Sequence, residues 1–513
     1  MMGVRPPFLP LKGGGREPKA RGWAADNDVR CNRRTVLSGG GMMLAASLLG
    51  CQKTGSLSGP SASGRLPEMR IGGIPAAFNA AEHPFRLGDN SAATPAWLYG
   101  DAPFPVYRMR LGESLDVTLT NRLTEHTSIH WHGVRGPNAM DGVPYVTQLP
   151  VQPGESFNYR FTPPDAGTYF FHPHCDTAAQ LGRGLAGVLI VDDESTAFDD
   201  DIVCVLKDWR VAKDGSFLPF VTTEGAGRGG TFGTLRTVNG LVAPNIAVPA
   251  GADIRVRLLN VDSTRVSDFG VQGAQGLVLA IDGNPVQPFA LDTWRLGPAM
   301  RMDIALRTPQ AGGRIVLTDF FAAEPVTLAT LVAAGAPKRG DAFAPVALST
   351  PKRAEPDLAN AEGHELKLSA SAAATDYPAP ASIQLADGRR IDLLDSLCST
   401  AQTLWAIDGK TWPQMGHENL PPPLMSFTRG TSVRIELANT TPHVHPMHLH
   451  GHSFKVLSAS KLKRPVHWAD TVLVMPDERV EIAFVADNPG NWMIHCHIVE
   501  HQDTGMMGWF RVV

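Results

Sequence analysis

The sequence has few cysteines, no long run of one charge and no long apolar run, and each shortage excludes a class of protein. Only six cysteines occur in 513 residues, too few for a disulfide framework in a chain of this length. The formal net charge is -4 without a long basic run, so nothing favours nucleic acid as a partner. The apolar run that ends at residue 50 is diluted by glycine and too short to span a bilayer.

Glycine and proline are abundant instead. The chain holds 51 glycines and 41 prolines, and its apolar residues alternate with polar ones over short segments, a pattern typical of strands bounded by turns. A length of 513 residues suits about three domains. We therefore predict an all-β protein with several cores.

The N-terminal segment carries the features of an export signal. Residues 30–51, RCNRRTVLSGGGMMLAASLLGC, hold Arg33 and Arg34 ahead of the apolar run and resemble a twin-arginine signal. The ending LLGC also resembles a lipoprotein cleavage box, in which Cys51 would carry a lipid that tethers the protein to a membrane. We predict a signal region and flexible tether over 1–65 and a location in the periplasm or cell envelope, with or without a lipid on Cys51.

Three segments of equal length repeat one plan: a glycine, an alternating strand and an asparagine. They read GESLDVTLTN at 112–121, GADIRVRLLN at 251–260 and GTSVRIELAN at 430–439. Equal spacing indicates three copies of one β domain. We predict domain limits of 66–195, 196–350 and 351–513, and the last range opens with a linker rich in proline and alanine.

Histidines follow the first and third copies of the repeat but not the second. They form four pairs whose members are two residues apart: His130 and His132, His172 and His174, His448 and His450, and His495 and His497. Residues two apart in a strand share a face, so each pair points one way. Eight imidazoles without a carboxylate or thiolate would hold more than one metal ion.

A second set of ligands points to the opposite face. Cys496 alternates with its two histidine neighbours, and His445 lies three residues before His448. Together with His501, and with Met506 as a weak axial thioether, they form the ligand set of a blue copper centre. Zinc is the alternative metal, but structural zinc sites have four ligands and do not repeat as four histidine pairs.

These clusters resemble the signature of three-domain multicopper oxidases, the family of laccases, bilirubin oxidases and copper-efflux oxidases. The likeness runs from about residue 66 to the C-terminus, and HCHIVEHQDTGMM is its most specific part. The resemblance implies three cupredoxin-like Greek-key β-sandwich domains and four copper ions. It assigns one type 1 copper to His445, Cys496, His501 and Met506, one type 2 copper to His130 and His448, and two type 3 coppers to His132, His172, His174, His450, His495 and His497.

The resemblance also implies a reaction. A small-molecule reductant would give single electrons at the type 1 copper, and dioxygen would be reduced to water at the other three. Cys496, bonded to His495 and His497, would join the two sites. Domain one has Pro173 where domain three has Cys496, so no blue copper is expected there.

Two aspartates have predicted roles beside the coppers. Asp141 in MDGV matches a family aspartate near the type 2 and type 3 coppers and is predicted to deliver protons; the alternative is a turn-forming aspartate before glycine. Asp470 in WADTV resembles a carboxylate that orients a type 1 histidine; the alternative is an exposed charge at a strand end. Some relatives have a glutamate where this chain has Gln502, a departure at a second position used for protons.

The donor is predicted to be a phenol or aromatic amine, as in laccases. Copper-efflux oxidases often carry a methionine-rich insertion that suits Cu(I), and here the linker and early third domain offer only Met415 and Met425. The alternative is a metallo-oxidase that oxidises Cu(I) or Fe(II) in copper tolerance. A copper-free structural relative or a simple electron carrier would leave the four histidine pairs unexplained.

Several other residues receive weaker predictions. We expect a monomer, and one disulfide among Cys175, Cys204 and Cys398 stays open. The remaining histidines are predicted to be surface or loop residues rather than ligands: His83, His126, His364, His417, His443, His452 and His467.

Overall fold

The structure of the protein is a computed structural model that describes residues 61, 63–88, 92–193, 198–344, 347–370, 404–412 and 420–513, with the backbone of 382–384 and 390–392. These residues belong to one compact unit, Gly55–Val513. The predictions for the export signal and for Arg33, Arg34, Cys51, Cys398, Met415 and His417 concern residues outside this part of the chain. No helix among the described residues is long and apolar enough to cross a membrane.

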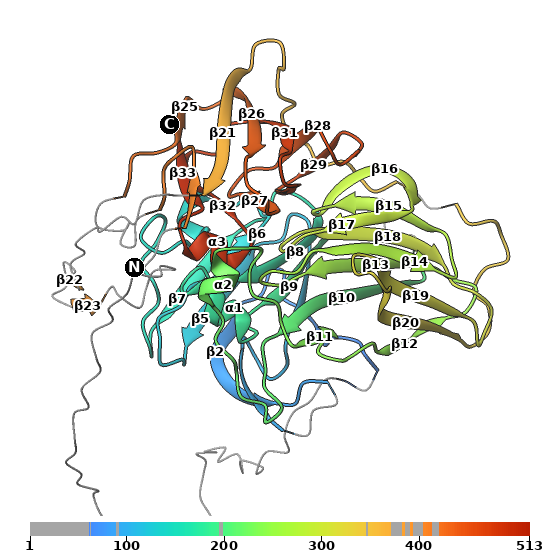
Figure 1. Ribbon diagram of the computed structural model, residues 1–513. Coiled ribbons are helices and arrows are strands. Elements are labelled where there is room, and N and C mark those ends of the chain that lie inside the picture. The colour runs from blue at the N-terminus through green and yellow to red at the C-terminus, as the bar shows by residue number, and fades with distance from the viewer. Residues whose placement is uncertain are drawn as a thin grey trace, which may run out of the picture. The chain divides into compact units, whose positions relative to one another are not determined.

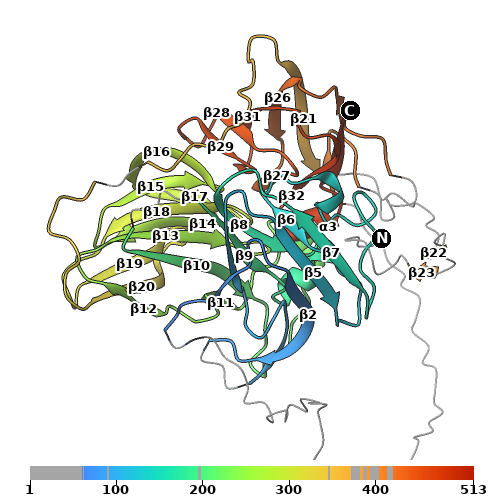
Figure 2. The same ribbon diagram turned by 180° about the vertical axis from the view of Figure 1, so that it is seen from behind.

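The described chain is almost entirely β, as predicted, and its strands form three pairs of sheets (Figures 1 and 2). The first pair comprises one sheet in the order β1 (Glu68–Arg70), β4 (Val106–Arg110), β9 (Gly187–Asp192), β8 (Gly167–His172), β6 (His130–His132), and a second in the order β3 (Thr94–Leu98), β2 (Ala76–Phe85), β5 (Leu115–Asn121), β7 (Ser156–Phe161).

The second pair of sheets comes from the middle of the chain. One sheet has the order β11 (Leu235–Val238), β10 (Asp200–Trp209), β13 (Asp253–Asn260), β18 (Arg301–Arg307), β15 (Gly276–Ile281), β16 (Asn284–Leu291). The other has the order β12 (Asn245–Pro249), β20 (Val326–Ala334), β19 (Arg314–Asp319), β14 (Ser267–Gln272), β17 (Thr293–Leu296).

The third pair comes from the C-terminal part. One sheet has the order β24 (Trp405–Ile407), β21 (Glu362–Ala370), β26 (Ser432–Asn439), β31 (Arg479–Val485), β28 (Phe454–Ala459), β29 (His467–Ala469). The other has the order β25 (Met425–Phe427), β33 (Met507–Val512), β32 (Gly490–Cys496), β27 (His445–Leu449), β30 (Thr471–Val474). Strands β22 (Ser382–Gln384) and β23 (Arg390–Asp392) pair antiparallel in a separate two-stranded sheet.

Each pair of sheets encloses its own apolar core, since alternate residues of both sheets are buried against each other. The strands of the three pairs span residues 68–192, 200–334 and 362–512. The limits proposed between the domains remain predictions.

The repeated segments occupy equivalent places in the three pairs. They become β5, β13 and β26, and each pairs in parallel with one strand and antiparallel with another. Each begins after a glycine with positive φ, which suits the tight turn: Gly112, Gly251 and Gly430.

The asparagine that ends each repeat closes the following turn. In all three copies its Oδ1 accepts a backbone N–H from two residues ahead, at 2.9 Å, 3.1 Å and 2.9 Å for Asn121, Asn260 and Asn439. Its amide nitrogen donates to two or more backbone carbonyls across the turn. In the first and third copies this turn leads into β6 and β27, the strands that carry histidines.

Helices are short and gather beside the histidine strands. Helices α1 (Thr177–Gly182), α2 (Thr223–Ala226) and α3 (Val499–Asp503) lie side by side (Figure 1). The 3-10 helix η1 (Asn138–Met140) contacts β32. Gln502 donates to Thr177 Oγ1 at 3.1 Å, and Asp503 accepts from the backbone of Ala178 at 3.3 Å. These contacts tie the segment after His174 to the segment after His497.

Candidate metal centres

One group of buried ligand atoms surrounds Cys496. Its Sγ lies 3.6 Å from Nδ1 of His445 and 3.6 Å from Nδ1 of His501, and those two nitrogens are 3.1 Å apart. The three side chains come from β32, β27 and α3 and are fully buried. Met506 belongs to the same apolar cluster, and its backbone oxygen accepts from Cys496 N. This cysteine centre could hold one metal ion.

Oxygen atoms hold the outer nitrogens of the cysteine centre. His445 Nε2 lies 2.8 Å from Thr441 Oγ1, and His501 Nε2 donates to the backbone oxygen of Arg228 at 2.6 Å. Because a carbonyl oxygen only accepts, Nδ1 of His501 keeps a lone pair that faces Cys496. Burial lowers the pKa of His501 to about 3 and raises the pKa of the Cys496 thiol. The imidazole therefore stays neutral, and a metal must displace the thiol proton.

Residues 222–231, the covering segment, lie over His501. Glu500 clips its two ends, because Oε1 accepts from Thr222 N at 3.0 Å and from Thr231 Oγ1 at 2.7 Å, and Oε2 accepts from Thr231 N. The indole of Trp405 donates to Ala226 O at 2.7 Å, and its ring centroid lies 4.5 Å from that of His501. The covering segment therefore packs directly against the outer edge of the His501 imidazole.

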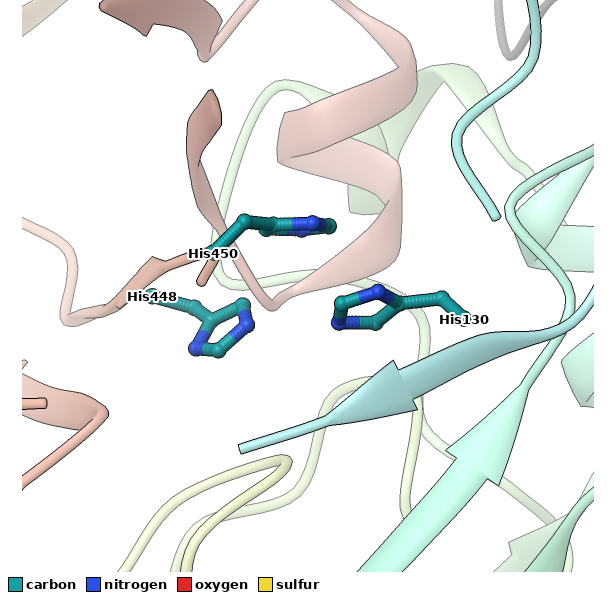
Figure 3. A group of neighbouring side chains, drawn as sticks. All are labelled: His130, His448 and His450. Atoms are coloured by element: carbon teal, nitrogen blue, oxygen red, sulfur yellow. The ribbon is translucent and has the colours of Figure 1, made fainter. Parts of the chain in front are cut away.

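The paired histidines gather in a second buried place, called here the eight-histidine centre. Figure 3 shows His130, from β6, facing His448 and His450, which lie on β27 and directly after it. The rings of His130 and His450 stack with their centroids 3.8 Å apart. The full set, joined by groups of converging nitrogens, is His130, His132, His172, His174, His448, His450, His495 and His497.

Three of these rings, His174, His450 and His495, point their Nε2 atoms at one another. His495 Nε2 lies 3.0 Å from His450 Nε2 and 3.4 Å from His174 Nε2. His450 Nδ1 donates to Asp141 Oδ2 at 2.9 Å, and His495 Nδ1 donates to the Cys496 carbonyl at 3.0 Å. Both Nε2 atoms therefore carry lone pairs, which repel at this distance unless a cation lies between them.

A proton does not serve as that cation. Burial lowers the pKa of His174, His450 and His495 well below the usual value for imidazole, so these rings stay neutral. A metal ion removes the repulsion without protonating a ring. The donor set, neutral nitrogens in a buried place, fits a metal that favours imidazole.

Two further rings offer free nitrogens. His130 Nδ1 donates to the Asp141 carbonyl at 2.8 Å and His448 Nδ1 to the Asp470 carbonyl at 2.8 Å. Within the described part of the chain, Nε2 of both rings is buried without a hydrogen-bond partner. Burying a polar nitrogen without a hydrogen-bond partner costs free energy, and binding of a metal ion to that nitrogen removes the cost.

Strand β32 joins the two centres. It pairs with β27 so that Cys496 lies opposite Met447 and His495 opposite His448. Alternation then sends the Cys496 sulfur toward the cysteine centre while the flanking imidazoles enter the eight-histidine centre. Figures 1 and 2 both show β27 and β32 beside β6, which brings His130 and His132.

Known proteins are similar to this chain over most of its length. Family models described as "Multicopper oxidase" match residues 84–196, 215–334 and 397–513. The solved structure of a multi-copper oxidase from Pseudomonas thermotolerans is 35% identical with a TM-score of 0.75, and the match covers 87% of this chain and 100% of that one. The chain belongs to the multicopper oxidase family.

Other relatives of this multicopper oxidase are similar over most of their length. Multicopper oxidase MmcO of Mycobacterium tuberculosis is 29% identical over 93% of this chain and 96% of its own. A laccase of Phlebia radiata is 28% identical over 79% of this chain and 84% of its own. Members of the family are oxidoreductases that use dioxygen, and the family implies copper, which the imidazole and thiolate donors described above fit.

Asp141 and Asp470 both lie in the eight-histidine centre of this multicopper oxidase. Asp141, which is 7% exposed, contacts His450 through its side chain and His130 through its carbonyl. Asp470 is 1% exposed and its Oδ1 lies 3.1 Å from His132 Nε2. The predicted role of Asp470 beside a type 1 histidine is therefore wrong, and so is the alternative of an exposed charge.

The register of β30 explains that error. In its pairing with β27, His448 lies opposite Thr471, whereas His445 lies opposite Val474. Asp470, the residue before β30, consequently sits beside His448 and away from the cysteine centre. Burial alone would raise the pKa of Asp470, but the Arg301 guanidinium beside it holds that pKa well below the usual range.

The other cysteines and histidines that the structure describes fall outside both centres. Cys175 and Cys204 are buried free thiols, so the described residues contain no disulfide. Three of the histidines predicted to be surface or loop residues are buried, at 6%, 4% and 3% exposure: His126, His467 and His452. His126 and His452 lie in loops, as the prediction allowed, whereas His467 begins β29. None of them joins a group of converging ligand atoms among the described residues.

Arg301, Glu500 and Thr441 are site residues that sequence reasoning missed. Each acts through a contact with a distant segment or with the outer edge of a histidine, and no motif marks such contacts in advance. Arg301 also comes from the middle sheet pair, which supplies no histidine to either centre.

Proposed function

We propose that this multicopper oxidase takes single electrons from phenols or aromatic amines at the cysteine centre and reduces dioxygen to water at the eight-histidine centre. The observation that supports this most is β32, a single strand that delivers Cys496 to one centre and His495 to the other. The four-electron reaction needs both centres in electronic contact.

We assign the ligands as follows. His445, Cys496, His501 and Met506 would hold one type 1 copper. His130 and His448, whose Nε2 atoms lack partners, would hold the type 2 copper. Six rings would hold the type 3 pair: His132, His172, His174, His450, His495 and His497. Bound copper would supply the one-electron couple and the binding of dioxygen.

The chain itself provides the path between the centres. Cys496 is bonded on either side to His495 and His497, and the Cys496 carbonyl also accepts from His495 Nδ1 at 3.0 Å. That hydrogen bond gives a second connection from the cysteine to the same ring. Asp141, which touches His450 and His130, would supply protons to the oxygen-reducing side.

We favour organic donors over Cu(I) because of how little the Met425 thioether is exposed. Binding of Cu(I) favours exposed thioethers, yet Met425 is 6% exposed and packs in the core of the third sheet pair. The second candidate is a metallo-oxidase of Cu(I) or Fe(II). Export by the twin-arginine route to the periplasm or cell envelope, a lipid on Cys51 and a monomeric state are further parts of the proposal.

A donor comparison tests the proposed substrate class. Copper-loaded protein is given a phenol, an aromatic amine, Cu(I) or Fe(II), and oxygen uptake is followed. We expect kcat/KM for the phenol or amine to exceed that for either metal ion by at least about tenfold, equivalent to about 1.4 kcal/mol at the transition state. A preference of that size for Cu(I) or Fe(II) contradicts the organic donor and establishes the metallo-oxidase.

Replacing Glu500 with glutamine should alter donor selection. The amide of glutamine has one accepting oxygen, so its NH2 group would face the Thr231 N–H that Oε2 of the carboxylate accepts, and hydrogen bonds to a charged acceptor contribute about 1.5–3 kcal/mol each. The covering segment then loosens over His501. We expect the ratio of kcat/KM for a small phenol to that for a bulky phenol to fall by about threefold or more.

Glu224→Gln is the matched control. Glu224 lies on the same segment, has a side chain that is 74% exposed and pairs with the exposed Arg228, at 3.0 Å. We expect it to keep the donor ratio of the wild-type protein. Equal ratios for Glu500→Gln and Glu224→Gln would show that the clip does not govern donor access.

A further inference from the structure

Arg301 lies at the meeting point of all three sheet pairs. It begins β18 of the middle pair and is 0% exposed. Its Nε donates to Thr168 O of β8 at 3.2 Å, and its other nitrogens donate to Ala299 O and Asp282 O at 3.1 Å each. The remaining two N–H groups go to Asp470, so all five donors of the guanidinium are used.

The contact with Asp470 is a paired one. Nη1 donates to Oδ1 at 2.8 Å and Nη2 donates to Oδ2 at 2.6 Å. Two parallel charge-assisted bonds fix both the position and the plane of a carboxylate, which a lysine cannot do. Arg301 also neutralises a carboxylate that is 1% exposed, and a buried charge without a partner is costly.

Asp470 in turn fixes two histidines of the eight-histidine centre. Its Oδ1 lies 3.1 Å from His132 Nε2, and its carbonyl accepts from His448 Nδ1 at 2.8 Å. The proton of each ring is thereby placed, so His132 presents Nδ1 and His448 presents Nε2. These two nitrogens are buried without partners among the described residues.

Asp470 does not act as a metal ligand in this arrangement, although its oxygen lies near the nitrogens of both rings. Oδ2 is occupied by Arg301, and Oδ1 accepts from Arg301, from His132 and from Thr471 Oγ1 at 2.8 Å. No lone pair of the carboxylate points freely into the centre. Asp470 is therefore a link between the guanidinium and the two rings.

We propose that Arg301 is a positioning residue for the eight-histidine centre, an inference that rests on the proposed copper assignment. Through the Asp470 carboxylate it sets which nitrogen of His132 faces the metal, and it anchors the residue whose backbone carbonyl accepts from His448 Nδ1. Partners behind ligands commonly change metal affinity by about 10–100-fold. The middle sheet pair, which carries no ligand, thus takes part in building the centre.

Arg301→Lys tests the proposal, with Arg257→Lys as matched control. Arg257 is also a buried arginine of the middle pair, at 1% exposure, and bonds Asp201 and Thr168 Oγ1 without contacting a histidine. Both variants lose a multiply bonded guanidinium. Only Arg301→Lys should change copper binding.

Different measurements report on the two centres: the blue absorption on the cysteine centre, and the type 2 copper spectrum on the eight-histidine centre. For Arg301→Lys we expect unchanged blue absorption, an altered electron paramagnetic resonance spectrum of the type 2 copper, and copper at the eight-histidine centre bound about 10–100-fold more weakly. Arg257→Lys should keep the wild-type spectrum and copper content even if it melts at a lower temperature. If Arg301→Lys does not fold, Asp470→Asn should show the same changes, because donors meet both carboxylate oxygens of Asp470 and the asparagine NH2 group would face one of them.

The copper content and spectrum of the wild-type protein distinguish a failure of the role proposed for Arg301 from a failure of the copper assignment. If the wild-type protein binds copper at both centres but Arg301→Lys and Asp470→Asn keep its spectrum and affinity, or Arg257→Lys changes them equally, the role of Arg301 is overturned and the copper assignment stands. If the wild-type protein itself lacks the blue absorption, the copper assignment fails first.

Discussion

Replacing Cys496 with serine should remove the blue absorption and almost all oxidase activity while the eight-histidine centre keeps its copper. The serine hydroxyl cannot supply the thiolate sulfur that a blue copper site requires as a ligand. The loss of activity should exceed the about 10–100-fold that follows loss of an outer partner of a ligand, because a direct ligand and the link between centres are both removed. The visible spectrum, copper per chain and oxygen uptake measure these effects.

Cys175→Ser is the control for Cys496→Ser. Cys175 is another buried free thiol, directly after His174, and its Sγ lies 3.7 Å from Ser128 Oγ. We expect this variant to keep the blue absorption and the activity. Full activity in Cys496→Ser, or an equal loss in both serine variants, would contradict the role given to Cys496.

Replacing Asp141 with asparagine should slow dioxygen reduction by about 10²-fold or more, the usual contribution of a positioned proton donor. Asparagine keeps an oxygen that can accept from His450 Nδ1, so the ring stays oriented and copper stays bound. It cannot carry a proton. Reoxidation of fully reduced protein by dioxygen isolates this step from donor oxidation.

Two comparisons sharpen the test of Asp141. Asp141→Ala removes the oxygen as well and should weaken copper binding by about 10–100-fold. Asp165→Asn changes a buried carboxylate of the same sheet pair that bonds Arg135 at 2.8 Å, and it should reoxidise at the wild-type rate. Normal reoxidation of Asp141→Asn would leave the aspartate with an orienting role only.

Strand alternation carried most of the sequence-based prediction of the site. Pairs of histidines two residues apart had to share a face, and Cys496 had to face away from His495 and His497. The structure places these side chains accordingly, in two groups of converging atoms. The family resemblance and the all-β fold are confirmed.

What the sequence could not predict depends on packing between distant segments. Asp470 was placed beside the wrong centre because nearness in sequence to the third-domain ligands does not reveal strand register. Arg301 reaches Asp470 across 169 residues, and Glu500 reaches Thr231 across 269. Contacts of that kind leave no spacing pattern in the chain.

The repeat shows why a short motif can be informative about the fold. Its glycine has a positive φ, and its asparagine closes a turn with the same hydrogen bonds in each copy. The pattern therefore reflects a requirement of the backbone, since the middle copy has it although no histidine lies between Asn260 and the end of β20.

Copper content and the visible spectrum of the purified, copper-loaded protein test the central claim most directly. The proposed assignment of one copper to the cysteine centre and three to the eight-histidine centre predicts four copper ions per chain, together with an intense blue absorption from the sulfur of Cys496. Copper well below four per chain, or four ions without the blue absorption, would contradict that arrangement.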